Sequence, residues 1–251
     1  MAIKTVHCCA HTFQLHYTLL HPTQSNTLVV LHGWGSSQAI MQRAFGAHLP
    51  QYRHIYIDLP GFGKSPNEVP LTTAEYAEIV RTFLARMDVV PQVVMGHSFG
   101  GKVATLLAPP CLVLLSSAGI RVPKPLKVRT KIALFKALKP FGIARLRRLF
   151  VSSDAREMNA GMYQTFKNVV DEDFSEHFAA FAGRGLCFWG RADTATPLWT
   201  GAQINKLLGN SRLIPMEGDH FFFLHHAGEI ARTIEQECLP TDSQSEPGDN
   251  A

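Results

Sequence analysis

The feature that most constrains this chain is a serine flanked by glycines at the end of a short apolar run. Residues 93–95 lead into Gly96-His97-Ser98-Phe99-Gly100, and a helix-compatible stretch follows at residues 103–108. A serine at the tip of a sharp strand-to-helix turn leaves no room for side chains two positions before or after it, and glycine at 96 and 100 meets that condition. The pattern therefore predicts a nucleophile elbow that displays Ser98.

The chain's length and composition are those of one globular domain with an insertion. It has 251 residues, of which 46% are hydrophobic and 18% charged, and a net charge of +4 gives no reason to expect a nucleic-acid partner. The first residues do not form a signal peptide, and no apolar run is long enough to span a bilayer. The cysteines are odd in number and follow no metal or disulfide spacing, so we expect reduced thiols and a cytoplasmic location: Cys8, Cys9, Cys111, Cys187 and Cys238.

Apolar runs and turn residues predict a sheet whose strands alternate with helices. Besides the strand before Ser98, we expect strands at residues 5–9, 13–19, 27–31, 54–58, 111–115, 185–190 and 213–216. Helices are expected at residues 38–49, after a capping box at Thr72-Thr73-Ala74-Glu75, and at 227–238. Strands that alternate with helices at these lengths predict an α/β fold, with a mostly parallel central sheet and helices on both faces.

The pattern changes between the strand at 111–115 and the strand at 185–190. Four helical segments without a convincing strand are expected there, at 130–138, 143–150, 158–169 and 174–181. We therefore predict a catalytic domain made of residues 1–119 and 185–240, an inserted helical cap at 120–184, and a disordered tail at 241–251.

The predicted cap is divided by charge. Residues 121–150 hold ten Lys or Arg and no Asp or Glu, whereas six acidic residues lie between 154 and 176. Two interpretations are open: a solvated cap whose halves form weak surface salt bridges, or a basic face that docks an acidic partner or an anionic membrane.

Three residues can supply serine-based nucleophilic catalysis. A serine hydroxyl needs a histidine to take its proton and a carboxylate to orient that histidine. Ser98, Asp193 and His220 each follow a predicted strand, and the carboxyl ends of parallel strands meet at one edge of a sheet. We predict that these three residues form a catalytic triad, and this mechanism requires no metal or cofactor.

Other residues compete for two of these roles. For the acid, the alternatives are Asp58, which more simply pins the loop that follows it by local hydrogen bonds, and Asp219. For the base, the alternatives are His225 and His226, which fall where the last helix or its approach should begin. We prefer Asp193 and His220.

Several segments together resemble the α/β-hydrolase superfamily over nearly the whole catalytic domain: His32-Gly33-Trp34-Gly35, Asp58-Leu59-Pro60-Gly61-Phe62-Gly63-Lys64-Ser65, the Ser98 elbow, Trp189-Gly190-x-x-Asp193, and His220. The resemblance implies an α/β-hydrolase fold with an oxyanion hole formed by the backbone N-H groups of Trp34 and Phe99. Each such donor contributes about 3 kcal/mol to transition-state stabilisation. We expect Trp34 and His97 to contact substrate, and His32 to brace the oxyanion loop.

The resemblance further implies a serine hydrolase that cleaves a small or medium carboxylic ester through an acyl-serine intermediate. Thioester cleavage, carbon-carbon bond hydrolysis and lyase chemistry use the same triad and remain alternatives. A non-catalytic protein that binds a ligand in the hydrolase pocket is an alternative of another class. The segments at 32–35 and 58–65 also resemble carboxylesterases that act on methyl esters of acyl carrier protein, which makes an acidic carrier protein a candidate partner for the basic cap.

Overall fold

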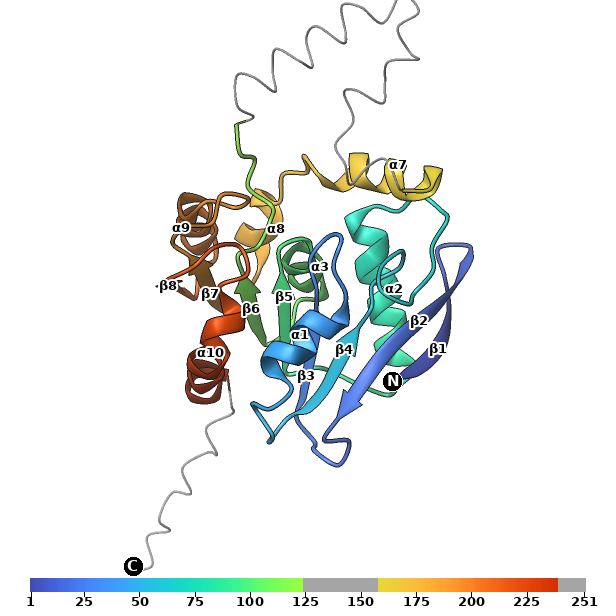
Figure 1. The fold of residues 1–251 in the computed structure, drawn as a ribbon, viewed down its shortest axis with the longest axis horizontal. Helices are drawn as coiled ribbons and strands as arrows, with labels where there is room; N and C mark the ends of the chain where they lie inside the picture. Colours follow the sequence, from blue (N-terminus) through green and yellow to red (C-terminus); the bar gives the residue numbers. More distant parts are fainter. Residues whose placement is uncertain (124–157, 239–251) are drawn as a thin grey trace, which may run out of the picture.

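The computed structural model of the chain describes residues 1–123 and 158–238. Within these residues an eight-stranded sheet has the order β1-β2-β4-β3-β5-β6-β7-β8 (Figure 1). The strands are β1 (Ala2–Cys8), β2 (His11–Leu20), β3 (Thr27–Leu31), β4 (Arg53–Ile57), β5 (Val93–His97), β6 (Cys111–Leu115), β7 (Arg184–Gly190) and β8 (Ser211–Met216). Strand β2 is antiparallel to both of its neighbours, and all pairs from β4 to β8 are parallel, so the predicted mostly parallel sheet is confirmed.

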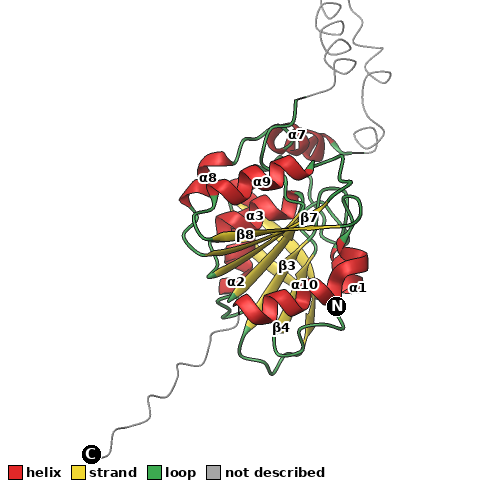
Figure 2. Cartoon of the chain, turned by 90° about the vertical axis from the view of Figure 1, so that its left-hand side faces the viewer, coloured by secondary structure: helices red, strands yellow, loops and turns green. Residues whose placement is uncertain are grey.

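Helices cover both faces of the sheet, as Figure 2 shows. One face carries α1 (Gln38–Phe45) and α10 (Phe223–Cys238), and the other carries α2 (Thr73–Ala85), α3 (Phe99–Leu107), α8 (Ser175–Ala180) and α9 (Leu198–Leu207). Every residue of β3, β5 and β6 is buried, which explains why these strands are continuous apolar runs in the sequence.

The ends of the helices agree in part with the predictions. The capping box before α2 is confirmed, because Thr72 Oγ1 accepts from the Glu75 N-H and the Glu75 carboxylate accepts from the Thr72 N-H. Helix α1 stops at Phe45, four residues before the predicted end, and α10 begins at Phe223, four residues before the predicted start. Helix α9 was not predicted. Its first turn directly follows Pro197, a residue type that suits the start of a helix.

Two cysteines that the sequence treats as unpaired are joined. Cys111 at the start of β6 and Cys238 at the end of α10 form a disulfide across 127 residues of sequence. The expectation of reduced thiols throughout is therefore wrong. The pairing depends on how α10 packs on the sheet, and two cysteines so far apart in sequence form no recognisable short motif. Cys8, Cys9 and Cys187 are free, and burial raises the pKa of the Cys187 thiol to about 12.

Two of the four helices predicted for the cap fall within the described residues and are confirmed. They are α7 (Ala160–Val169), which lies over the carboxyl ends of the central strands in Figure 1, and α8. The helices predicted at 130–138 and 143–150, and the tail predicted at 241–251, lie outside the described residues, as does the basic run apart from Arg121. In residues 1–123 and 158–238, no helix is long and apolar enough to cross a membrane.

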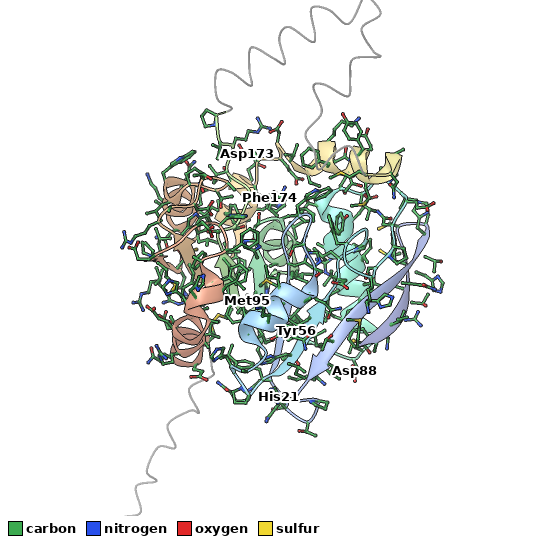
Figure 3. All side chains as sticks on the ribbon, viewed as in Figure 1. His21, Tyr56, Asp88, Met95, Asp173 and Phe174 are labelled. Atoms are coloured by element: carbon green, nitrogen blue, oxygen red, sulfur yellow. A yellow bond between two sulfur atoms is a disulfide. The ribbon has the colours of Figure 1, made fainter. Side chains whose placement is uncertain are left out.

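An ion pair joins the segment between α7 and α8 to α3, the helix that follows Ser98. Lys102 Nζ on α3 lies 2.9 Å from Glu172 Oε2, between α7 and α8, and also donates to the Val169 carbonyl at 2.7 Å. The same carboxylate accepts from Thr73 Oγ1 at 2.5 Å, and Lys102 Nζ lies 5.2 Å from the centre of the Phe174 ring. Burial lowers the pKa of Lys102, and the hydrogen bond and charge of Glu172 oppose that shift. Figure 3 labels Phe174, whose ring lies beside this ion pair, at the end of the molecule opposite His21.

We expect Glu172→Ala to lower the free energy of unfolding by about 2 kcal/mol, because it leaves the Lys102 ammonium buried without its counter-charge. The expected cost is below that of a fully buried pair, since 31% of the Glu172 side chain is exposed. Urea unfolding measures the change. The double variant Lys102→Met with Glu172→Ala should regain most of the lost stability. If the destabilisations of the two single variants add up in the double variant, the two side chains are not coupled and the prediction is contradicted.

Candidate active site

Ser98 lies at a strained turn between β5 and α3. Its backbone has φ 51° and ψ −115°, a combination that non-glycine residues rarely adopt. A Cβ atom on Gly96 would lie 2.3 Å from the Gly100 carbonyl oxygen, and one on Gly100 would lie 2.5 Å from the His32 carbonyl oxygen. Both glycines are therefore required by close backbone approach, and the predicted elbow geometry is present.

Asp193 and His220 are bonded to each other. Asp193 follows β7, His220 follows β8, and His220 Nδ1 lies 2.8 Å from Asp193 Oδ2. The other carboxylate oxygen, Oδ1, accepts from the N-H groups of Ala195 and Thr196 at 2.8 and 2.9 Å. Burial alone would raise the pKa of Asp193, but hydrogen bonds from His220, Thr196 and Ser116 outweigh it and lower this pKa to about 2. Asp193 is therefore a carboxylate at any pH near neutrality.

His97, the residue before Ser98, connects the elbow to the His220 loop. The rings of His97 and His220 lie 4.6 Å apart between centroids, and His97 Nε2 donates to the His220 carbonyl oxygen at 3.0 Å. Within the described residues the Ser98 hydroxyl makes no hydrogen bond. Hydrogen bonds between catalytic groups are often long in unliganded enzymes and shorten when substrate binds.

The burial of His97 does not favour the predicted contact with substrate. The residue is 1% exposed, and its ring is enclosed by His220, Phe221 and Phe223. Burial, followed by the charge of His220, lowers the pKa of His97 to about 3, so its imidazole is neutral. A neutral ring that donates from Nε2 holds the backbone of the His220 loop in place, which is a positioning role.

The loop after β3 brings a second backbone segment close to Ser98. A Cβ atom on Gly33 would lie 3.1 Å from Ser98 Cβ. The next amide, that of Trp34, has no hydrogen bond to the described part of the chain, and Phe99 supplies the first amide of α3, which has no partner within the helix. Two free N-H groups near one hydroxyl are what an oxyanion hole requires.

Side chains hold this loop from both sides. The buried His32 accepts from the Leu59 N-H through Nε2 at 3.0 Å, so its proton is on Nδ1, which donates to the Gly33 carbonyl at 2.8 Å. This is the bracing contact expected of His32. The Trp34 indole packs edge-on against Phe62, with 4.8 Å between ring centroids, and lies 5.4 Å from the Phe166 ring centroid, which links the loop to α7.

The four competing residues serve local structure. Asp58 accepts from the backbone and side chain of Gln38 and from the Lys64 N-H, and so pins its loop as expected. Asp219 is exposed and accepts from the Phe221 N-H. His226 bonds the Glu217 carbonyl, and His225 is exposed on α10.

Sequence reasoning missed Thr196, which touches the bonded pair. Its Oγ1 lies 2.8 Å from Asp193 Oδ2, 3.1 Å from the Ser116 carbonyl oxygen and 3.4 Å from His220 Nδ1. The available signal was an aspartate with a threonine three residues later, a spacing at which an Asp carboxylate bonds the local backbone.

Comparison with known proteins agrees with this fold. A sequence profile of the alpha/beta hydrolase family matches residues 28–233. The chain is 25% identical over 246 residues to the pimeloyl-(acyl-carrier protein) methyl ester esterase of Aeromonas hydrophila, covering 84% of this chain and 95% of that one. It is 32% identical over 95 residues, 38% of this chain and 36% of the other, to the 2-succinyl-6-hydroxy-2,4-cyclohexadiene-1-carboxylate synthase of Citrobacter koseri. A thermophilic esterase from Thermogutta terrifontis superimposes with a TM-score of 0.72 at 14% identity, covering 94% and 97% of the two chains.

The chain belongs to the α/β hydrolase family, because the profile spans most of its length. The predicted α/β-hydrolase fold is confirmed, and so is the prediction of a family hydrolase.

We expect His97→Ala to lower kcat by roughly ten- to a hundredfold on p-nitrophenyl acetate, because the His220 loop loses the donor that fixes its backbone. KM should stay within about twofold, since the side chain is shielded from substrate. His97→Gln, which keeps an N-H donor, should regain part of the rate. A raised KM with unchanged kcat would instead restore the substrate-contact role.

Proposed function

We propose that this chain is a serine hydrolase that cleaves carboxylic esters through an acyl-serine intermediate. The observation that carries the proposal is the Asp193–His220 hydrogen bond, held beside the strained Ser98 turn by His97. An orienting carboxylate, a basic imidazole and a displayed hydroxyl are the groups that acyl transfer to serine needs.

The steps follow from the positions of these groups. His220 takes the Ser98 proton while Ser98 Oγ attacks the ester carbonyl, and Asp193 stabilises the resulting imidazolium. The N-H groups of Trp34 and Phe99 donate to the oxyanion of the tetrahedral intermediate. His220 then gives its proton to the departing alcohol. In the second half, His220 takes a proton from water as the water oxygen attacks the acyl-serine carbonyl. The tetrahedral intermediate then collapses, the bond to Ser98 Oγ breaks, and His220 returns its proton to Ser98 Oγ as the carboxylic acid leaves.

Ester cleavage is favoured over the other reactions of this triad by the relatives. The Aeromonas hydrophila relative, similar over most of both chains, is named a methyl ester esterase. The Citrobacter koseri relative, similar over about a third, is named a synthase, so lyase chemistry is the second candidate. Thioester and carbon-carbon bond cleavage, and a ligand-binding role without catalysis, are the remaining alternatives.

The substrate we propose is a methyl ester carried on an acidic acyl carrier protein. The name of the Aeromonas hydrophila relative supports this class, and ten basic residues between 121 and 150 would attract such a partner. A cavity of about 180 Å³ adjoins Thr196, and its lining mixes apolar residues such as Ile120 and Val170 with the charged Lys102 and Glu172.

The inserted cap at 120–184 and a cytoplasmic location belong to the same proposal. Strand β7 begins at Arg184, within one residue of the predicted end of the cap. Three free cysteines suit a reducing compartment, whereas the Cys111–Cys238 disulfide does not, so the redox state of that pair in freshly lysed cells tests the location.

We expect Ser98→Ala to lower hydrolysis of p-nitrophenyl acetate by about 10⁴-fold or more, because it removes the nucleophile and leaves only binding and the oxyanion donors. Ser117→Ala, which removes a hydroxyl at the end of β6 that bonds the Ala118 carbonyl, is the matched control and should stay within about tenfold of wild type. Comparable loss in both variants, or activity retained in Ser98→Ala, would refute the role of Ser98.

Docking of a carrier protein predicts a substrate-specific salt dependence. The variant Arg145→Glu/Arg147→Glu/Arg148→Glu should lose kcat/KM for an acyl carrier protein methyl ester at low salt, and hardly change on a small neutral ester. The loss should fade as the Debye length falls from about 10 Å at 0.1 M salt to 3 Å at 1 M. Equal losses on both substrates would mean that the cap was damaged, and no loss would leave the basic run as a solvated face.

A further inference from the structure

Two donors converge on one oxygen of the Asp193 carboxylate. Oδ2 lies 2.8 Å from His220 Nδ1 and 2.8 Å from Thr196 Oγ1, and those two atoms are 3.4 Å apart. The Asp193 side chain is fully shielded from solvent, and Thr196 is 8% exposed.

The Thr196 hydroxyl has one proton and two acceptors within reach. The alternatives are Asp193 Oδ2 at 2.8 Å and the Ser116 carbonyl oxygen at 3.1 Å. A hydroxyl donates one hydrogen bond, and a bond to an ionised acceptor is shorter and stronger than one to a neutral carbonyl. The proton therefore points to Asp193 Oδ2, the oxygen that also holds His220.

This arrangement acts against protonation of His220 in two ways. The Thr196 proton neutralises part of the charge on Oδ2 that would stabilise an imidazolium. In addition, a proton on the line from Thr196 Oγ1 to Asp193 Oδ2 is closer to His220 Nδ1 than Thr196 Oγ1 is, as the three distances show. The positive end of the Thr196 hydroxyl dipole therefore faces His220.

We propose that Thr196 is a positioning residue whose hydroxyl limits how strongly Asp193 stabilises protonated His220, so that the general base stays free to accept the Ser98 proton down to lower pH. The inference rests on the proposed function, since it concerns the base of that reaction. It adds a fourth side chain to the site and assigns it an effect on the pH range of activity.

The other titratable groups around His220 come from several elements. Asp193 follows β7, and His97 at the end of β5 faces the ring. Asp219, next to His220 in its own loop, is exposed and bonded to the Phe221 N-H. Arg191 and Glu217, after β7 and β8, pair with each other at 3.1 Å. Apart from Asp193, none of these groups is hydrogen-bonded to the Thr196 side chain in the described residues.

The test uses Thr196→Val, which replaces the hydroxyl by a methyl group, and Thr196→Ser, which keeps it. The readouts are the pH at half-maximal kcat/KM for p-nitrophenyl acetate and the NMR titration midpoint of the His220 ring, assigned by its absence in His220→Gln. We expect Thr196→Val to move both midpoints up by about half a pH unit to one unit. Thr196→Ser should lie within about 0.2 unit of wild type.

Controls separate this effect from a change in packing. Thr200 is also buried and bonds the Pro197 carbonyl at 2.8 Å, so Thr200→Val removes a buried hydroxyl four residues away and should leave both midpoints in place. Thr196→Ala is the second deletion variant, in case valine disturbs the fold.

Midpoints that stay or move down in Thr196→Val and Thr196→Ala would overturn the inference, and so would an equal shift in Thr200→Val. The NMR titration needs no turnover. If the wild-type protein hydrolyses no ester but the NMR midpoint of His220 still rises in Thr196→Val, the effect of Thr196 on the Asp193–His220 pair is upheld. Only the proposed function is then rejected.

Discussion

The site depends on one constraint, the close backbone approach at the Ser98 turn. The carbonyl oxygens of His32 and Gly100 lie where side chains at 100 and 96 would otherwise be, so β3, β5 and α3 can meet only because both positions are glycine. That contact holds Ser98 at a positive φ angle and sets the loop after β3 beside its hydroxyl. The stability of the buried sheet compensates for the strain of this turn.

The other predicted site residues lie at the same edge of the sheet as Ser98 because the sheet is parallel from β4 to β8. Asp193 and His220 follow neighbouring strands β7 and β8, and their hydrogen bond closes the gap between the two loops. His97 bonds the His220 backbone to the strand before Ser98, while Lys102 bonds α3 to the end of α7. Each contact joins segments that are distant in sequence, so the site forms only when the whole sheet does.

What the sequence could predict was set by short-range patterns. The elbow glycines, the capping box at Thr72 and the strand before Asp193 each leave a local signal of apolar runs or turn residues. The pairing of Cys111 with Cys238, the buried setting of His97 and the contact of Thr196 with Asp193 depend on packing across the sheet or on a side chain's direction. Helix α9 left only a partial signal in the sequence. Pro197 precedes its first turn, but the apolar periodicity of the helix is weak.

The central claim is that the Ser98 hydroxyl is the nucleophile of an ester hydrolase, and the most direct measurement is covalent labelling by a fluorophosphonate followed by peptide mapping. Reaction of an activated serine replaces fluoride by the serine oxygen. The account predicts one adduct per chain, located on Ser98, with loss of hydrolysis in proportion to labelling. Full esterase activity in a chain that takes up no adduct, or an adduct on another residue that removes the activity, would contradict it.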